Sequence, residues 1–249
     1  MNKLPTINSN LDTFNKNIEV INNDNMTELI KFDIRSDAFK KCIRFINYEL
    51  VDGDILEFGV YSGRSLAILS YCNNEYYKNE NKINSKTNMN RKIYGFDSFE
   101  GLPETEGHPR WTKTLFKYNH SYHPVIQKGE LITPKSVEDF FGYMNLDKPL
   151  IIKNYYNNLN IDNIEKIALC HIDCDLYLST KQVLNLIKDK LVNGSILMFD
   201  DWFNYKGDPD KGEQKAYLEF LDNNKHIKSQ LFERYATFCQ AFIITIDNK

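Results

Sequence analysis

The sequence has no long hydrophobic run. No stretch approaches the roughly 20 consecutive apolar residues that cross a bilayer, and the opening residues MNKLPTINSNLDTFNKN lack the apolar stretch of a secretory signal peptide. A net charge of −3 and a pI near 6.0 give no overall attraction to nucleic acid or to an anionic membrane. We therefore expect a cytoplasmic protein that acts on a small molecule, with neither nucleic acid nor membrane as a partner.

Cysteine is scarce, and the few cysteines are odd in number and widely spread: Cys42, Cys72, Cys170, Cys174 and Cys239. This pattern excludes a simple disulfide framework and favours reduced structural thiols in a reducing compartment. No internal repeat is visible. The 249 residues, of which 42% are hydrophobic and 13% aromatic, are enough to bury the core of one α/β domain.

Segments of strand and helix pattern alternate along most of the chain. Residues 1–50 predict an N-terminal helical segment that packs on the core through apolar positions at helical spacing: Phe39, Ile43, Ile46 and Leu50. In residues 51–249 we predict strands at 54–60, 92–97, 149–153, 166–173, 195–200, 230–235 and 239–246. One helix should start near Ser65, whose hydroxyl can cap it, and further helices are predicted at 133–141, 179–191 and 215–221. The alternation predicts a mostly parallel sheet covered on both faces, with the last two strands as antiparallel neighbours.

Two connections are too long for plain turns. Residues 72–91 form a polar, Asn-rich insert that we predict to be an exposed loop. Residues 104–130 combine aromatic side chains with three histidines and predict a lid; these residues are Trp111, Phe116, Tyr118, Tyr122, His108, His120 and His123. No regular ligand spacing links the histidines, so we interpret them as acceptor contacts or surface residues rather than metal ligands.

Two pairs of carboxylates follow two neighbouring predicted strands. Asp173 and Asp175 end one strand, and Asp200 and Asp201 end the next. Carboxylates that meet at one sheet edge repel one another and raise each other's pKa unless a cation or a proton intervenes. A hard divalent cation is the simplest occupant, and ligands that are all oxygen favour Mg²⁺ over zinc.

The first strand–helix loop predicts a ligand site of its own. The glycines Gly59 and Gly63 allow a close backbone approach, but their G-x-x-x-G spacing and the preceding Glu57 do not suit a dinucleotide. Glu57 would repel a pyrophosphate and attract an ammonium or sulfonium group. Asp97, at the end of the second strand, is placed to accept ribose hydroxyls. Each feature alone has an ordinary structural explanation, but their order along the chain predicts a cationic nucleoside.

Four segments carry a family resemblance: ILEFGVYSGRS, YGFDSFEGLPE, HIDCDLYLST and LVNGSILMFDDW. They resemble the blocks of class I S-adenosylmethionine (SAM) dependent methyltransferases, and among these the macrocin-type sugar O-methyltransferases. The resemblance spans about residues 52–220 and implies a doubly wound, Rossmann-like sheet of seven strands with a C-terminal antiparallel hairpin. It departs from the family pattern at Arg64, at Ser195 and in KNYY at 153–156, where the family often has glycine.

The resemblance also implies the cofactors and the residues that hold them. Mg²⁺ would bind Asp173, Asp200 and Asp201. The candidate SAM contacts are Glu57, Gly59, Tyr61, Gly63, Ser65, Asp97 and Ser98. Methyl transfer to an alcohol needs the oxygen, the methyl carbon and the sulfur in line. It also needs a hydroxyl with a lowered pKa, and a bound Mg²⁺ lowers the pKa of a hydroxyl that it coordinates. We interpret Asp173 as ligand and general base, with Asp175 or His171 as alternative bases, although a hydrogen-bonded interior histidine is the simpler interpretation of His171.

Other functions remain open at this stage. Asp173-x-Asp175 also fits a metal-dependent glycosyltransferase, which would leave Glu57 and the second acidic pair unexplained, and a non-catalytic SAM-fold partner protein is a third hypothesis. Within methyl transfer, the acceptor could be a nucleotide-activated sugar, a sugar on a glycan or natural product, or an amine. A homo-oligomer formed through the N-terminal helices is also left open.

Overall fold

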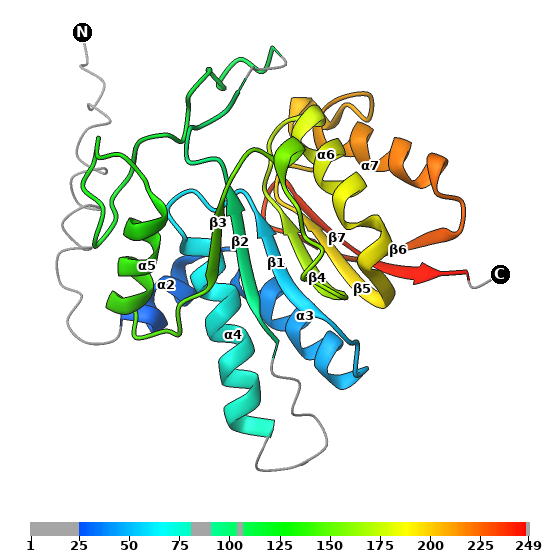
Figure 1. The fold of residues 1–249 in the computed structure, drawn as a ribbon, viewed down its shortest axis with the longest axis horizontal. Helices are drawn as coiled ribbons and strands as arrows, with labels where there is room; N and C mark the ends of the chain where they lie inside the picture. The colour runs from blue at the N-terminus through cyan, green and yellow to red at the C-terminus, as the bar shows by residue number, and fades with distance from the viewer. Residues whose placement is uncertain (1–24, 81–90, 104–106, 248–249) are drawn as a thin grey trace, which may run out of the picture.

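The computed structural model describes residues 25–80, 91–103 and 107–247, and these residues build a single sheet of seven strands in the order β3-β2-β1-β4-β5-β7-β6 (Figure 1). The strands are β1 (Asp54–Phe58), β2 (Ile93–Asp97), β3 (Leu150–Lys153), β4 (Ile167–Ile172), β5 (Leu191–Phe199), β6 (Ile227–Tyr235) and β7 (Cys239–Ile246). β1 to β5 are parallel, and β7 runs antiparallel to both β5 and β6. The predicted doubly wound sheet with its C-terminal hairpin is confirmed.

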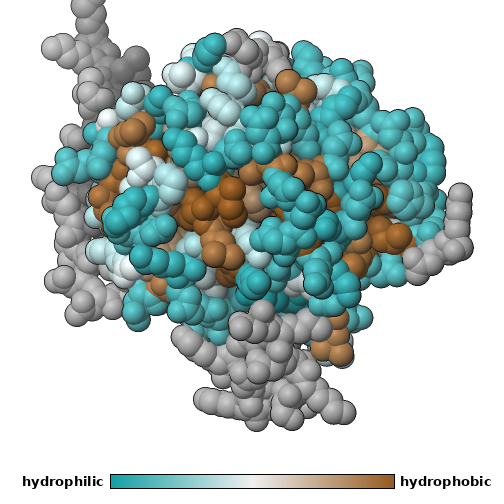
Figure 2. All heavy atoms as spheres, in the orientation of Figure 1, coloured by the Kyte–Doolittle hydropathy of each residue, from teal (hydrophilic) through white to brown (hydrophobic). Residues whose placement is uncertain are grey.

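Helices cover both faces of the sheet. They are α2 (Asn25–Phe32), α3 (Ser36–Tyr48), α4 (Arg64–Glu80), α5 (Pro134–Tyr143), α6 (Tyr177–Ile187) and α7 (Gly212–Asn223). One apolar layer joins α3, α4 and α5 to the sheet, and a second joins α6 and α7 to its other face. Polar residues cover most of the face drawn in Figure 2, and apolar residues reach the surface across its middle. Two packed layers therefore hold the carboxyl ends of β1, β2, β4 and β5 at one edge.

In the described part of the N-terminal segment, α3 packs its apolar side chains against the core. Phe39, Ile43 and Ile46 on α3 are fully buried, and each such side chain stabilises the fold by about 1.5–3 kcal/mol. The prediction is wrong for Leu50, which is 51% exposed. Leu50 lies beyond the end of α3 at φ 53°, where the chain turns toward β1. Residues 1–24 of the predicted segment lie outside the described residues.

Several predicted boundaries shift. α4 continues through Glu80, so the first part of the insert predicted as a loop is helical, because extending a formed helix adds a hydrogen bond for each residue it orders. The rest of the insert, residues 81–90, lies outside the described residues. Ser65 lies inside α4 rather than capping it. β5 begins at Leu191, earlier than predicted, and the Oγ of Ser195 donates to Ile167 O (2.6 Å) and accepts from Val192 N (2.8 Å), which joins β5 to β4.

All five cysteines are buried and free, as the interpretation of structural thiols requires. Among the helices of the described ranges, none combines the length and the hydropathy needed to span a membrane.

Candidate active site

A cavity of about 510 Å³ opens at the carboxyl ends of the strands. This is the edge at which doubly wound sheets bind ligands, and the volume suits a small molecule. Six residues predicted from the sequence line it: Gly59, Tyr61, Asp97, Ser98, Asp173 and Asp175. Phe116 from the predicted lid lines it as well, together with the chain after β3 at residues 154–158.

The first loop is shaped by Gly59 and Asp97. Gly59 has φ +92°, and a Cβ at this position would lie 1.8 Å from the carbonyl oxygen of Asp173, so only glycine fits against the exit of β4. The carboxylate of Asp97 accepts the main-chain N–H groups of Val60 (2.9 Å), Tyr61 (2.8 Å) and Phe99 (2.7 Å). Burial raises the pKa of Asp97 above its ordinary value, although these N–H groups act in the opposite direction. Asp97 therefore fixes the loop that borders the cavity.

Glu57 lies beneath that loop. Its side chain is fully buried; Ser65 Oγ donates to Oε1 (3.0 Å), and Nδ1 of His171 lies 2.9 Å from Oε2. Glu57, Ser65 and Gly63 are not among the residues that line the cavity. In this structure Glu57 orients His171 and the start of α4, and the predicted attraction to a sulfonium would act from behind the loop.

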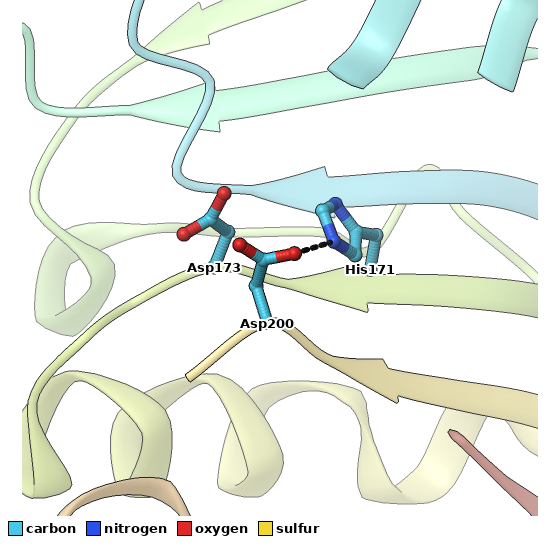
Figure 3. A group of neighbouring side chains, drawn as sticks. All are labelled: His171, Asp173 and Asp200. Carbon is cyan, nitrogen blue, oxygen red and sulfur yellow. Dashed lines mark ion pairs between the residues drawn. The ribbon is translucent and has the colours of Figure 1, made fainter. Parts of the chain in front are cut away.

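The two acidic pairs come together because β4 and β5 are adjacent and parallel. Ligand atoms from Asp173, Asp175 and Asp201 lie within 4.8 Å of one another. A second group of the same compactness consists of His171, Asp173 and Asp200 (Figure 3). Asp173 belongs to both groups and is therefore the centre of the cluster.

One flank of the cluster contains positive charge from the protein. Nη1 of Arg35, the residue before α3, lies 3.6 Å from Asp173 Oδ2 and 3.6 Å from Asp200 Oδ1. Asp33 holds the same guanidinium through Nε (3.0 Å) and Nη2 (2.9 Å). His171 Nε2 lies 3.4 Å from Asp200 Oδ1 (Figure 3). We call Arg35, His171 and Asp200 the compensated flank.

Contacts within the compensated flank shift the pKa values of Asp200 and His171. Burial alone would raise the pKa of Asp200, but the charges of Arg35 and His171 hold it below its ordinary value. Burial alone would lower the pKa of His171, but the hydrogen bond to Glu57 and the charges of Asp200 and Glu57 raise it to about 10. Asp200 and His171 thus form a buried ion pair at neutral pH.

The opposite flank consists of Asp175, Asp201 and Glu213, and we call it the acidic flank. Asn204 Nδ2 donates to Asp201 Oδ1, and the carboxylates of Asp175 and Asp201 lie within 4.8 Å of each other. Burial and mutual repulsion raise the pKa of all three carboxyl groups. Closely spaced oxygen ligands in need of positive charge fit a hard divalent cation, and Mg²⁺ in particular.

Three functional candidates escaped the sequence analysis. Asp33 and Arg35 precede α3, and Glu213 lies in the first turn of α7. An acidic residue in a first helical turn is common because it favours the helix dipole, so Glu213 carries no distinctive signal. Arg35 lies far from the motifs, and only the fold brings it to Asp173.

The predicted lid is fastened to the first loop. Tyr61 Oη accepts the N–H of His120 (2.9 Å), and Arg64, which departs from the family pattern, donates to Tyr122 O. Nε2 of His123 lies 3.2 Å from Ser62 O. Within the described ranges, neither candidate ligand group includes a histidine of this segment.

Solved structures share this fold. The O-methyltransferase NovP aligns with a TM-score of 0.61 at 17% identity, over 85% of this chain and 79% of NovP. The calicheamicin methyltransferase CalS11 aligns with a TM-score of 0.53 at 21% identity, over 96% and 86%. The SAH-bound methyltransferase PaMTH1 of Podospora anserina aligns with a TM-score of 0.50 at 15% identity, over 100% of both chains. No curated protein matches the chain at a significant level.

The family model of macrocin-O-methyltransferase (TylF) matches residues 31–233. This range contains both acidic pairs, the first loop and Arg35, and it covers most of the chain. The match favours methyl transfer over the glycosyltransferase and non-catalytic alternatives. The chain belongs to the macrocin-O-methyltransferase (TylF) family and is a SAM-dependent O-methyltransferase.

Proposed function

We propose that the protein transfers the methyl group of SAM, with the help of Mg²⁺, to a hydroxyl of a sugar that is nucleotide-activated or part of a glycoside. The observation that carries the proposal is the cluster of carboxylates within 4.8 Å of one another, two of which line the cavity beside Gly59 and Asp97. CalS11, which shares the fold, is a TDP-rhamnose 3'-O-methyltransferase. A nucleotide-activated sugar is therefore the first acceptor class to test.

Asp173, Asp200 and Asp201 are the proposed ligands of Mg²⁺. Asp175 lies within 4.8 Å of Asp173 and Asp201 and adds negative charge beside the proposed ligands. When bound, Mg²⁺ lowers the pKa of a hydroxyl group and so favours its deprotonation. The carboxylates also hold the acceptor at the wall of the cavity, where alignment with the methyl group decides the rate.

Asp173 is the proposed base. It lines the cavity and its side chain is 26% exposed, whereas His171 is fully buried with its two ring nitrogens directed to Glu57 and Asp200. His171 therefore orients Asp200. For SAM, the proposed direct contacts are Gly59, Tyr61, Asp97 and Ser98, which line the cavity. Glu57, Gly63 and Ser65 support the loop from behind.

Residues 104–130 are the proposed lid over the acceptor, and the structure describes residues 107–130 of it. Phe116 lines the cavity, and the segment forms hydrogen bonds with Tyr61 and Arg64.

The proposed compartment is the cytoplasm. Five buried free thiols support this proposal, because free thiols persist in a reducing environment.

The test is a methyl-transfer assay with SAM, using nucleotide-activated sugars and glycosides as acceptors and mass spectrometry as the readout. We expect methylated sugar in Mg²⁺ and none in EDTA, with recovery when Mg²⁺ is restored. Equal methylation in EDTA would contradict the metal requirement. Transfer of the sugar itself from a nucleotide sugar would instead support the glycosyltransferase alternative.

A further inference from the structure

Glu213 occupies an unusual position behind the acidic cluster. It is only 1% exposed and lies in the first turn of α7. Its Oε2 accepts the N–H of Asp201 (3.0 Å), and its Oε1 accepts the N–H of Cys174 (3.4 Å), the residue between Asp173 and Asp175. One carboxylate therefore bridges the main chains of the two segments that carry the acidic pairs.

This bridge lies where the strand ladder ends. β4 and β5 stay in register up to the pair Ile172 and Phe199, and one more main-chain bond follows from Asp200 N to Ile172 O (3.0 Å). Beyond that point no strand pairing sets the distance between the segments that follow β4 and β5. The carboxylate of Glu213 spans this gap, and the neighbouring Gln214 donates to Trp202 O (2.7 Å), which fastens α7 to the exit of β5.

A buried carboxyl group at this place has a physical explanation. Two N–H groups donate to it at the N-terminus of α7, and backbone donors and the helix dipole both offset part of the cost of burying it beside other acids. The first turn of a helix alone would not require Glu213 to point at the loops of two different strands. Its contacts instead match those of a residue that holds metal ligands in place from outside the ligand set.

We propose that Glu213 is a positioning residue: by bridging the N–H groups of Cys174 and Asp201, it sets the separation at which Asp173 and Asp201 present their oxygens to a divalent cation. The inference rests on the proposed function, because it needs a metal site. It assigns no contact between Glu213 and the ion itself.

The test is a titration with Mn²⁺ monitored by electron paramagnetic resonance, with S-adenosylhomocysteine bound. Glu213→Asp keeps the charge but shortens the reach, so one of the two N–H groups loses its partner. We expect its Mn²⁺ affinity to fall roughly 10- to 100-fold, as for other supporting residues of metal sites. Glu213→Gln should lose a similar factor. Glu219→Gln is the matched control on the same helix, since Glu219 pairs with Lys181 at the surface and leaves the cluster untouched.

The outcomes separate the alternatives. If Glu213 acted only through its charge, Glu213→Asp would bind Mn²⁺ like the wild type and the inference would be wrong. If it served only the fold, both variants would melt earlier with and without Mn²⁺ while keeping wild-type Mn²⁺ affinity, which also overturns it. Unchanged affinity for S-adenosylhomocysteine shows that each variant is folded; should Glu213→Gln fail this check, Glu213→Asp decides alone. A wild type that binds no Mn²⁺ overturns the proposed function instead.

Discussion

The two flanks of the carboxylate cluster balance their charge in different ways. On the compensated flank, Asp200 has Arg35 at 3.6 Å and His171 at 3.4 Å, and its pKa is lowered. On the acidic flank, Asp175 and Asp201 contact other acids, and their pKa values are raised. The protein thus supplies cations to one flank and leaves the other in need of a proton or an ion.

The difference suggests a division of labour. The compensated flank comes from the residue before α3, from β4 and from the residue after β5, and Arg35 and His171 hold the carboxylate of Asp200. The carboxylates of the acidic flank repel one another, and a divalent cation bound there would relieve this repulsion. A metal site of this kind gains affinity from the acidic flank and geometry from the compensated one.

The largest effect is expected at Asp173, which lies between the two flanks and belongs to both candidate ligand groups. Asp173→Asn should weaken Mn²⁺ binding at least about 100-fold, because it removes a proposed ligand rather than a supporting residue. The affinity for S-adenosylhomocysteine, measured by calorimetry, should change far less. If this variant bound Mn²⁺ as tightly as the wild type, Asp173 would not be a metal ligand, and the comparison of the two flanks around it would fail.

A comparison of Asp200→Asn with Asp175→Asn tests which acid completes the ligand set. We expect Asp200→Asn to lose nearly as much Mn²⁺ affinity as Asp173→Asn. Asp175→Asn should lose about tenfold, since Asp175 lies beside Asp173 and Asp201 without being a proposed ligand. Titrations of both variants under one condition give the order, and the reverse order would move the ion entirely onto the acidic flank.

Arg35 should oppose the ion. Its guanidinium lies beside Asp173 and Asp200, where it repels an arriving cation. Arg35→Gln is expected to bind Mn²⁺ about three- to tenfold more tightly, a gain of up to about 1.4 kcal/mol, and to melt at a lower temperature without metal. Lys41→Gln on α3, whose partner Glu233 lies away from the cluster, is the control. Weaker Mn²⁺ binding would mean that Arg35 serves the site by holding Asp200 in place.

The smallest effect concerns pH. The folded pKa of His171 is raised from 6.5 to about 10. Its ion pairs therefore stabilise the fold in full below pH 6.5, and this contribution is lost as the pH rises toward 10. The metal-free wild type should lose unfolding free energy more steeply between pH 7 and 9.5 than His171→Gln, as measured by urea denaturation. Parallel slopes would show that His171 is not charged in the folded protein.

The sequence predicted those parts of the site that follow from strand order. Asp173 and Asp201 meet because carboxyl ends of adjacent parallel strands share an edge, and Gly59 is needed where the first loop touches Asp173. Arg35 and Glu213 could not be predicted, because helices that pack over the sheet edge bring them to the cluster from distant parts of the chain.

Local signals also gave wrong results where tertiary contacts replaced them. Ser65 was predicted as a helix cap, since a hydroxyl before an apolar run is a common start signal. In the fold its Oγ bonds to the buried Glu57 instead. Leu50 was predicted to be buried by helical spacing, but α3 ends before it. Periodicity identified the elements, whereas the ends of elements depended on contacts that one segment of sequence does not contain.

The central claim is that the carboxylates at the ends of β4 and β5 bind a divalent cation next to the SAM cavity. Anomalous diffraction from crystals grown with S-adenosylhomocysteine and Mn²⁺ tests it most directly. The account predicts one strong anomalous peak within coordination distance of Asp173 and Asp201, with S-adenosylhomocysteine bound along Gly59 and Asp97. Bound S-adenosylhomocysteine without any peak between these carboxylates would contradict it.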